Sequence, residues 1–318
     1  MSKIAFRLHK SPLAFLIVLM SLTAFENGGA QNRQAPTDEF SKPLVPEVEV
    51  QKEDYTRARG AFRTKLIRNA PALPPDWTPP RPPEGTAEVL YQSGPLSLKA
   101  WINRPAGNDN RRRVAVLFLH SAFFFRPEFW EMSKPYRDAG FIVMTPLLRG
   151  ENGQAGRWSM FYDEVDDVVA AAEYLRNQSF VDPDNLYIAG HSNGGTLAML
   201  AAMTYHHFRA AAAFSGSPDQ VLFCRHFRQK DIIPFDYTDQ REIQLRSPLA
   251  YAASFKCPIR IYFGREESNI LSLTSQRTAE IAREKRLDVQ AVQVEGGHVT
   301  AVPEEIRLSI EFFRQHGR

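Results

Sequence analysis

The sequence has few cysteines and only a small excess of charge. Its 318 residues include two cysteines, Cys224 and Cys257. Neither has a cysteine or histidine at the spacing of a zinc site, so zinc is not indicated. Two interpretations of the pair stay open, a disulfide and two buried free thiols, because connectivity cannot be deduced from spacing alone.

The formal net charge is only +3, and most of it lies in residues 1–30. That segment has three basic residues and one acidic residue, a net +2, which leaves +1 for the remainder. So weak a field does not recruit nucleic acid or an anionic membrane, and we exclude both as partners.

Motifs for nucleotide cofactors and repeats are also missing. There is no P-loop, and Gly150, Gly153 and Gly156 follow a strand by too long a loop to form a dinucleotide fingerprint. No internal repeat occurs at solenoid or propeller periods. Acidic residues at Asp163, Asp166 and Asp167 resemble a metal cluster, but their expected place is the start of a helix. We therefore expect neither a cofactor nor a metal.

Residues 1–30 have the features of a secretory signal. A basic start precedes an apolar run over Leu13–Phe25, and small residues precede Gln31. The run is shorter than the ~20 residues that span a bilayer, so we expect cleavage, no stable membrane insertion afterwards, and a secreted or periplasmic protein. An uncleaved anchor is the alternative.

Residues 31–83 have the composition of an extension. Seven prolines between Pro71 and Pro83 make a stiff linker. Before them, Asp54–Asn69 is predicted to be a short amphipathic helix, with Tyr55, Phe62, Leu66 and Ile67 on its apolar side. We expect this helix to dock on the following domain, because so few apolar residues do not offset the entropy of ordering it.

Residues 84–318 alternate strands with helices. The predicted strands are 87–91, 96–102, 114–120, 141–145, 186–189, 210–214, 259–263 and 289–294. The predicted helices are 128–139, 162–177, 194–205, 272–285 and 303–316. Near-continuous apolar strands are typical of parallel strands that are covered on both faces. The pattern predicts an α/β fold with a doubly wound, mostly parallel sheet of about eight strands.

One insertion, residues 217–255, interrupts this alternation after the sixth strand. It is rich in aromatic and charged residues. Loops at the carboxyl ends of such strands surround the ligand site, so a lid or substrate wall is expected.

The segment Leu186–Leu200 contains Gly-His-Ser-Asn-Gly between an apolar strand and an apolar helix. This is the context in which Gly-x-Ser-x-Gly forms a nucleophile elbow, and it predicts Ser192 as the nucleophile. Gly190 and Gly194 lack a Cβ, which lets strand and helix close on each other.

A serine needs a base, and the base needs an orienting acid. In this arrangement the chain order is serine, carboxylate, histidine. Strand 259–263 is followed by Glu266 and Glu267, and strand 289–294 by His298. We assign His298 as base and Glu267 as acid, with Glu266 as the rival. His120 and His191 flank the site and are expected to form hydrogen bonds around it.

From Glu84 to its end the chain resembles an α/β-hydrolase of the prolyl-oligopeptidase and dienelactone-hydrolase branch, without a propeller. The matching motifs are Leu148-Arg149-Gly150, Gly156-Arg157-Trp158, Val181-Asp182-Pro183-Asp184, Gly190 to Gly195, Ser247-Pro248-Leu249 and Gly296-Gly297-His298. The resemblance implies the triad Ser192, Glu267 and His298, although the acid is normally aspartate.

The family's His-Gly-Gly segment is replaced here by His120-Ser121-Ala122. The oxyanion donors that the resemblance implies are the backbone N–H groups of Asn193 and Ala122, with Phe123 as the alternative to Ala122. Phe123, Phe124 and Trp158 are candidates for an apolar substrate pocket.

The expected function is a serine hydrolase that acts on a small-molecule or short-peptide substrate through an acyl-enzyme. Ester bonds are favoured, because no acidic pair is placed to grip a peptide amino terminus. A propeller-less peptidase for short peptides is the alternative. A non-catalytic binding protein on a hydrolase scaffold is the rival of a different class, because a fold does not guarantee activity.

Overall fold

The computed structural model describes residues 48–69, 77–105, 111–226 and 230–317. The leader predicted for residues 1–30, and the start of the extension, lie outside the described residues. Within the described ranges, no helix has the length and apolarity needed to cross a membrane.

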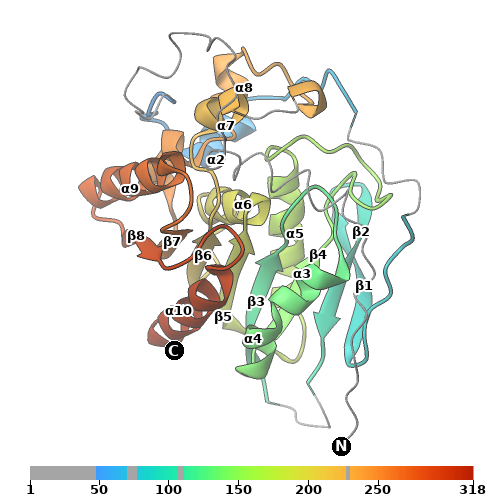
Figure 1. The fold of residues 1–318 in the computed structure, drawn as a ribbon. Coiled ribbons are helices and arrows are strands. Elements are labelled where there is room, and N and C mark those ends of the chain that lie inside the picture. Colours follow the sequence, from blue (N-terminus) through green and yellow to red (C-terminus); the bar gives the residue numbers. More distant parts are fainter. Residues whose placement is uncertain (1–47, 70–76, 106–110, 227–229, 318) are drawn as a thin grey trace, which may run out of the picture.

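A single eight-stranded sheet organises the domain (Figure 1). The strands are β1 (Thr86–Ser93), β2 (Leu96–Asn103), β3 (Arg113–Leu119), β4 (Ile142–Pro146), β5 (Val181–His191), β6 (Ala210–Phe214), β7 (Ile259–Gly264) and β8 (Val289–Val294). Their order is β1-β2-β4-β3-β5-β6-β7-β8. Only the pairs that involve β2 are antiparallel. The predicted, mostly parallel α/β sheet is confirmed.

Helices cover both faces of the sheet, as its apolar strands require. One face carries α3 (Pro127–Met132), α4 (Lys134–Asp138) and α10 (Val302–Gln315). The other carries α5 (Glu164–Arg176), α6 (Asn193–Ala202) and α9 (Asn269–Glu284). Two apolar cores result, and every residue of β6 between them is buried.

The helix predicted over residues 128–139 is wrong in one respect, because the structure divides it at Ser133 into α3 and α4. Pro135 has no N–H to donate to a carbonyl of the preceding turn. The Ser133 hydroxyl donates to the carbonyl of Trp130 at 2.7 Å and so satisfies the end of α3.

The helix predicted over Asp54–Asn69 is too long. Helix α2 spans only Tyr55–Gly60, and the Asp54 carboxylate caps it by accepting from the N–H groups of Thr56 and Arg57. After the last helical bonds of Ala61 and Phe62, the backbone N–H groups of Lys65, Ile67 and Arg68 donate to the insertion instead of to a helix. Leu66, expected on an apolar helix face, pairs with Phe235 in an isolated antiparallel bridge.

The insertion predicted at residues 217–255 lies between β6 and β7. It consists of α7 (Gln220–His226), α8 (Gln240–Gln244) and two 3-10 segments, η1 (Lys230–Ile232) and η2 (Pro248–Ser254). Residues 48–69, here called the N-terminal arm, pack on it at the top of Figure 1. The lid role of the insertion stays a prediction.

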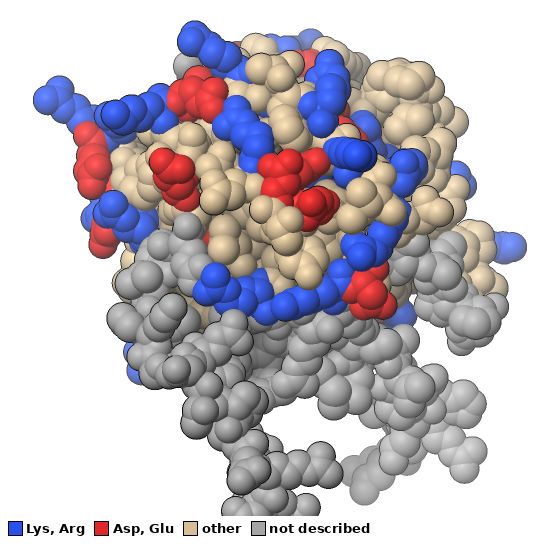
Figure 2. Space-filling model, turned by 90° about the horizontal axis from the view of Figure 1, so that it is seen from above, with Lys and Arg blue, Asp and Glu red and all other residues tan. Residues whose placement is uncertain are grey.

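Figure 2 views the molecule from above this region. Acidic and basic side chains are interspersed over the described part of that face. A surface with mixed charges has little net field with which to steer a highly charged partner.

Both cysteines are free thiols. Cys224 is buried on α7 and Cys257 is partly buried before β7. Burial raises the pKa of each thiol to about 12. Because the thiolate is the reactive form of cysteine, both thiols are expected to be unreactive at neutral pH.

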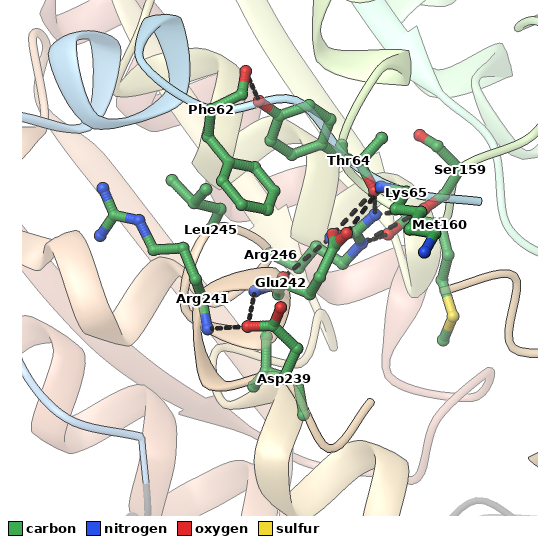
Figure 3. A network of polar contacts seen from close by, with 12 residues as sticks. Phe62, Thr64, Lys65, Ser159, Met160, Asp239, Arg241, Glu242, Leu245 and Arg246 are labelled. Carbon is green, nitrogen blue, oxygen red and sulfur yellow. Dashed lines mark hydrogen bonds and ion pairs between the residues drawn. The ribbon is translucent and has the colours of Figure 1, made fainter. Parts of the chain in front are cut away.

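Arg246 joins the N-terminal arm, the insertion and the loop before α5 (Figure 3). Its side chain is fully buried and donates to the Glu242 carboxylate at 2.5 Å. It also donates to the carbonyl of Met160 at 2.8 Å and the hydroxyl of Thr64 at 2.7 Å. The Phe235 ring lies 3.8 Å from the guanidinium carbon. Three separate chain segments thus meet at one cation.

Arg246→Ala should lower the free energy of unfolding by about 3–5 kcal/mol, because it leaves the buried Glu242 carboxylate without its cation. Denaturant titration measures this change. The matched control is Arg307→Ala, which breaks exposed pairs with Glu304 and Glu311 and should leave stability nearly unchanged. Equal effects of the two substitutions would contradict the role given to Arg246.

Candidate active site

Ser192 occupies a strained turn between β5 and α6. Its φ is 57° and its ψ is −116°, an uncommon conformation for a residue with a side chain. A Cβ on Gly190 would lie 2.3 Å from the carbonyl oxygen of Gly194, and one on Gly194 would lie 2.2 Å from that of Leu119. Both positions therefore require glycine, and the predicted elbow has the close packing that the motif implies.

Glu267 and His298 meet at the same edge of the sheet. They follow β7 and β8, which are parallel neighbours, so their carboxyl ends lie side by side. The distance from His298 Nδ1 to Glu267 Oε1 is 2.7 Å, and both side chains are nearly buried. A carboxylate accepts from Nδ1–H, which leaves the lone pair on Nε2 available as a base.

The carboxylate of Glu267 is held from a second side. Its Oε2 accepts from the Ser215 hydroxyl and from the Gly264 N–H, each at 2.7 Å. Glu266, the rival acid, is exposed. The structure therefore places Glu267 against the imidazole. The sequence did not indicate Ser215. This residue follows β6, and it lies beside Glu267 only because β6 and β7 are neighbours in the sheet.

Glu305 lies on α10, close to Ser215 and Glu267. The side chain is completely buried, and neither oxygen has a hydrogen-bond partner of normal geometry. Burial raises the pKa of Glu305 well above its usual value, and the charge of Glu267 adds to the shift. The neutral form of Glu305 is thus favoured over the charged form. The sequence reasoning missed Glu305, although its helical spacing with Val302 and Ser309 places it on the buried side of α10.

The two predicted oxyanion donors lie at the turns around Ser192. Asn193 begins α6, where backbone N–H groups have no partner within the helix. Ala122 has a φ of 65°, in the region that favours the glycine it replaces. Asn152, which the sequence did not indicate, fixes the same loop. Its side chain accepts from Phe125 N–H at 2.6 Å and donates to the Phe125 carbonyl at 2.9 Å.

His120 forms a buried pair with Glu151, from Nε2 to Oε2 at 3.0 Å. Burial opposes its protonation, but the Glu151 carboxylate outweighs burial and raises the pKa of His120. Its Nδ1 lies 2.8 Å from the carbonyl oxygen of Ser121. A protonated imidazole donates at both nitrogens and satisfies both acceptors.

A small, largely enclosed cavity of about 10 Å³ adjoins the predicted donors, with room for about one water molecule. Its wall includes Ala122, Asn193, Trp158, Phe161, Leu148, Leu197, Glu151 and Glu164. Of the predicted pocket residues, Trp158 lines the cavity. The ring of Phe123 packs edge-on against that of Trp158, with the ring centroids 4.6 Å apart. Phe124 instead packs under the Arg126 guanidinium.

The acidic residues around the start of α5 are structural. Asp163 lies at the N-cap position of the helix without a side-chain capping bond, Asp166 pairs with Arg59 at 2.7 Å, and Asp167 pairs with Arg149 at 2.7 Å. In the part of the chain that the structure describes, no group of three or more His, Cys, Asp or Glu residues is arranged to hold a metal.

Comparison with known sequences gives a family match. The model of the prolyl oligopeptidase family matches residues 127–316. The chain is 24% identical over 194 residues to the uncharacterised peptidase YtmA of Bacillus subtilis, which covers 57% of this chain and 73% of that protein. It is also 24% identical over 156 residues to the putative esterase YitV of the same organism, covering 44% and 61%.

Solved structures share the fold. Pyrococcus horikoshii acylaminoacyl peptidase superposes with a TM-score of 0.60 at 19% identity, over 72% of this chain and 41% of that one. An esterase from Thermogutta terrifontis superposes with a TM-score of 0.59 at 21% identity, over 74% and 95%. The chain therefore spans less than half of the peptidase and nearly all of the esterase.

Glu305→Gln should flatten the pH dependence of stability. The folded-state pKa of Glu305 is raised, so its contribution is fully present below the unfolded pKa of about 4.3 and is lost as pH rises. Glutamine does not ionise, so the variant should gain in melting temperature over the wild type from pH 4 to pH 8.

The control for this prediction is Glu304→Gln, the exposed neighbour on the same helix turn. The pKa of Glu304 is lowered, chiefly by the hydrogen bond from Arg307, so its loss should not raise stability as pH rises. If the melting temperatures of the wild type and Glu305→Gln change with pH in the same way across this range, the pKa of Glu305 is not raised in the folded protein.

Proposed function

Because this chain belongs to the prolyl oligopeptidase family of serine hydrolases, as the match over residues 127–316 shows, we propose that Ser192, Glu267 and His298 are its catalytic triad and that its substrates are esters. One observation carries the proposal. The 2.7 Å pair of Glu267 and His298 lies at the sheet edge where the strained Ser192 also lies. Ionisable pairs next to a strained serine are typical of active sites.

The reaction is acyl transfer to water in two halves. His298 Nε2 takes the hydroxyl proton as Ser192 Oγ attacks the substrate carbonyl, and Glu267 stabilises the imidazolium that forms. The N–H groups of Asn193 and Ala122 stabilise the oxyanion, and one such donor contributes about 2.7–4 kcal/mol. His298 returns the proton to the leaving alcohol. Water then attacks the acyl-enzyme with His298 again as base, and no step requires a cofactor.

The state of the carboxylates in the cavity wall supports esters over peptides. Glu151 is already paired with His120. Glu164 accepts from the N–H and hydroxyl of Ser159 at 2.5 and 2.7 Å, and burial raises its pKa to about 7. Neither carboxylate is therefore offered to the ammonium group of a peptide, which needs an anionic partner when it is buried.

A peptidase for short peptides is the second candidate. The observation that favours it is the family itself, together with the relatives that are described as peptidases. The same triad cleaves both bond types, so the two candidates differ in the substrate pocket and not in the chemistry.

Export also belongs to the proposal. It rests on the leader predicted in residues 1–30, with its basic start and short apolar run. Sequencing the amino terminus of the mature protein tests it. A mature chain that still begins at Met1 would contradict cleavage.

A substrate panel tests the ester preference. We expect measurable turnover of p-nitrophenyl acetate and butyrate, and turnover of aminoacyl and N-acyl-dipeptidyl p-nitroanilides at least 100-fold lower in kcat/KM. That ratio is about 2.7 kcal/mol of transition-state discrimination. Equal or faster hydrolysis of any anilide would favour the peptidase.

Two substitutions test the acid. Glu267→Gln should lower kcat by roughly 10³–10⁴-fold, because an amide does not hold His298 in the required tautomer or stabilise its charged form. Glu266→Gln is the matched control and should keep kcat near that of the wild type, since Glu266 is exposed. The reverse order of the two effects would move the acid to Glu266.

A further inference from the structure

The imidazole of His191 is buried between three loops of the proposed site. Its Nε2 lies 2.6 Å from the carbonyl oxygen of His298, and its Nδ1 lies 2.5 Å from the hydroxyl oxygen of Ser121. The rings of His191 and His298 are tilted, with centroids 4.7 Å apart. Both nitrogens therefore have a partner, and each partner is on a different loop.

These partners fix the tautomer of His191. A carbonyl oxygen only accepts, so Nε2 carries the hydrogen and donates it to His298. Nδ1 then has a lone pair, which accepts from the Ser121 hydroxyl. Burial lowers the pKa of His191 to about 3, and the nearby His298 adds to this effect. The ring is therefore neutral at neutral pH, and both hydrogen bonds persist there.

Each bonded group is next to, or part of, a proposed functional group. His191 directly precedes Ser192 in the chain, and Ser121 directly precedes Ala122. The carbonyl that accepts from Nε2 belongs to His298 itself. One side chain next to the nucleophile thus bonds to Ser121, beside an oxyanion donor, and to the base His298, which lie 70 and 107 residues away in the chain.

We propose that His191 is a positioning residue, which sets the spacing of Ser192, His298 and the Ala122 N–H through these two hydrogen bonds. This inference rests on the proposed function, because it concerns the positions of groups in the proposed triad and oxyanion hole. A displacement of about 1 Å at a reacting group costs on the order of 10²-fold in rate. The effect of losing His191 should therefore fall on kcat and leave KM within about threefold.

Two substitutions separate the two hydrogen bonds. The amide nitrogen of glutamine reaches about as far as Nε2, so His191→Gln keeps the donor to His298 and loses the acceptor for Ser121. The amide of asparagine reaches about as far as Nδ1, so His191→Asn keeps the acceptor for Ser121 and loses the bond to His298. With p-nitrophenyl acetate, we expect His191→Asn to lower kcat about 100-fold and His191→Gln about 10-fold.

Ser121→Ala completes a double-mutant cycle. It removes the hydrogen bond that His191→Gln has already lost, so the double variant should match His191→Gln within about twofold. Added to His191→Asn, it should lower kcat by a further factor of about 10. The matched control is His206→Gln, because His206 is an exposed histidine outside the site and should keep wild-type kcat.

The outcomes distinguish this inference from the proposed function. If the wild type does not turn over the ester, or if Ser192→Ala keeps full activity, the proposed function fails. If Ser192→Ala is inactive while both His191 variants keep wild-type kcat, the positioning role is overturned. Factors for Ser121→Ala that multiply fully with both His191 variants would also overturn it.

If the His191 variants do not fold, a measurement on the unmodified protein tests the two hydrogen bonds of His191 directly. ¹⁵N NMR of the imidazole should show His191 as the neutral Nε2–H tautomer between pH 5 and pH 9 in the wild type. An Nδ1–H tautomer, or protonation of the ring within this range, would contradict the two hydrogen bonds on which the role depends.

Discussion

The reversal of the chain at Ser192 is the constraint on which the rest of the site depends. A side chain held at a positive φ costs on the order of 1–3 kcal/mol and persists only where its surroundings enforce it. Here the N–H of Ser192 donates to the Phe214 carbonyl at 2.8 Å, and its own carbonyl accepts from Thr196 at 3.1 Å. Helix α6 is buried over nearly its whole length. The parallel strands β7 and β8 then bring Glu267 and His298 to the same edge.

The ionisable groups around this turn differ in their burial and in their hydrogen-bond partners. Glu267 accepts three hydrogen bonds, whereas the neighbouring Glu305 has no partner of normal geometry and burial raises its pKa well above the usual value. Burial opposes protonation of His120 but the Glu151 carboxylate raises its pKa, whereas burial lowers the pKa of His191 to about 3. The carboxyl group that contacts His298 is that of Glu267, as the proposed reaction requires of an imidazole that becomes positive.

Much of the fold followed from the sequence, because apolar runs and helical periodicity placed all eight strands and most helices. The elbow and the pair of Glu267 and His298 also followed, since each lies directly after a strand whose direction was known. Residues that depend on tertiary packing did not. Ser215 became relevant only through the order of β6 and β7, and Glu305 resembled an ordinary acid at a helix start. Residues 61–69 lost their predicted helix because Glu242 and Phe235 supplied other partners.

Mapping the covalent adduct of a fluorophosphonate probe tests the central claim most directly, because the probe captures an activated serine whatever the natural substrate is. Tandem mass spectrometry of the treated protein should place the adduct on Ser192 alone. The same treatment of His298→Ala should leave Ser192 unmodified, since the hydroxyl then has no base. An adduct on another residue, or equal labelling of Ser192 without His298, would contradict the account.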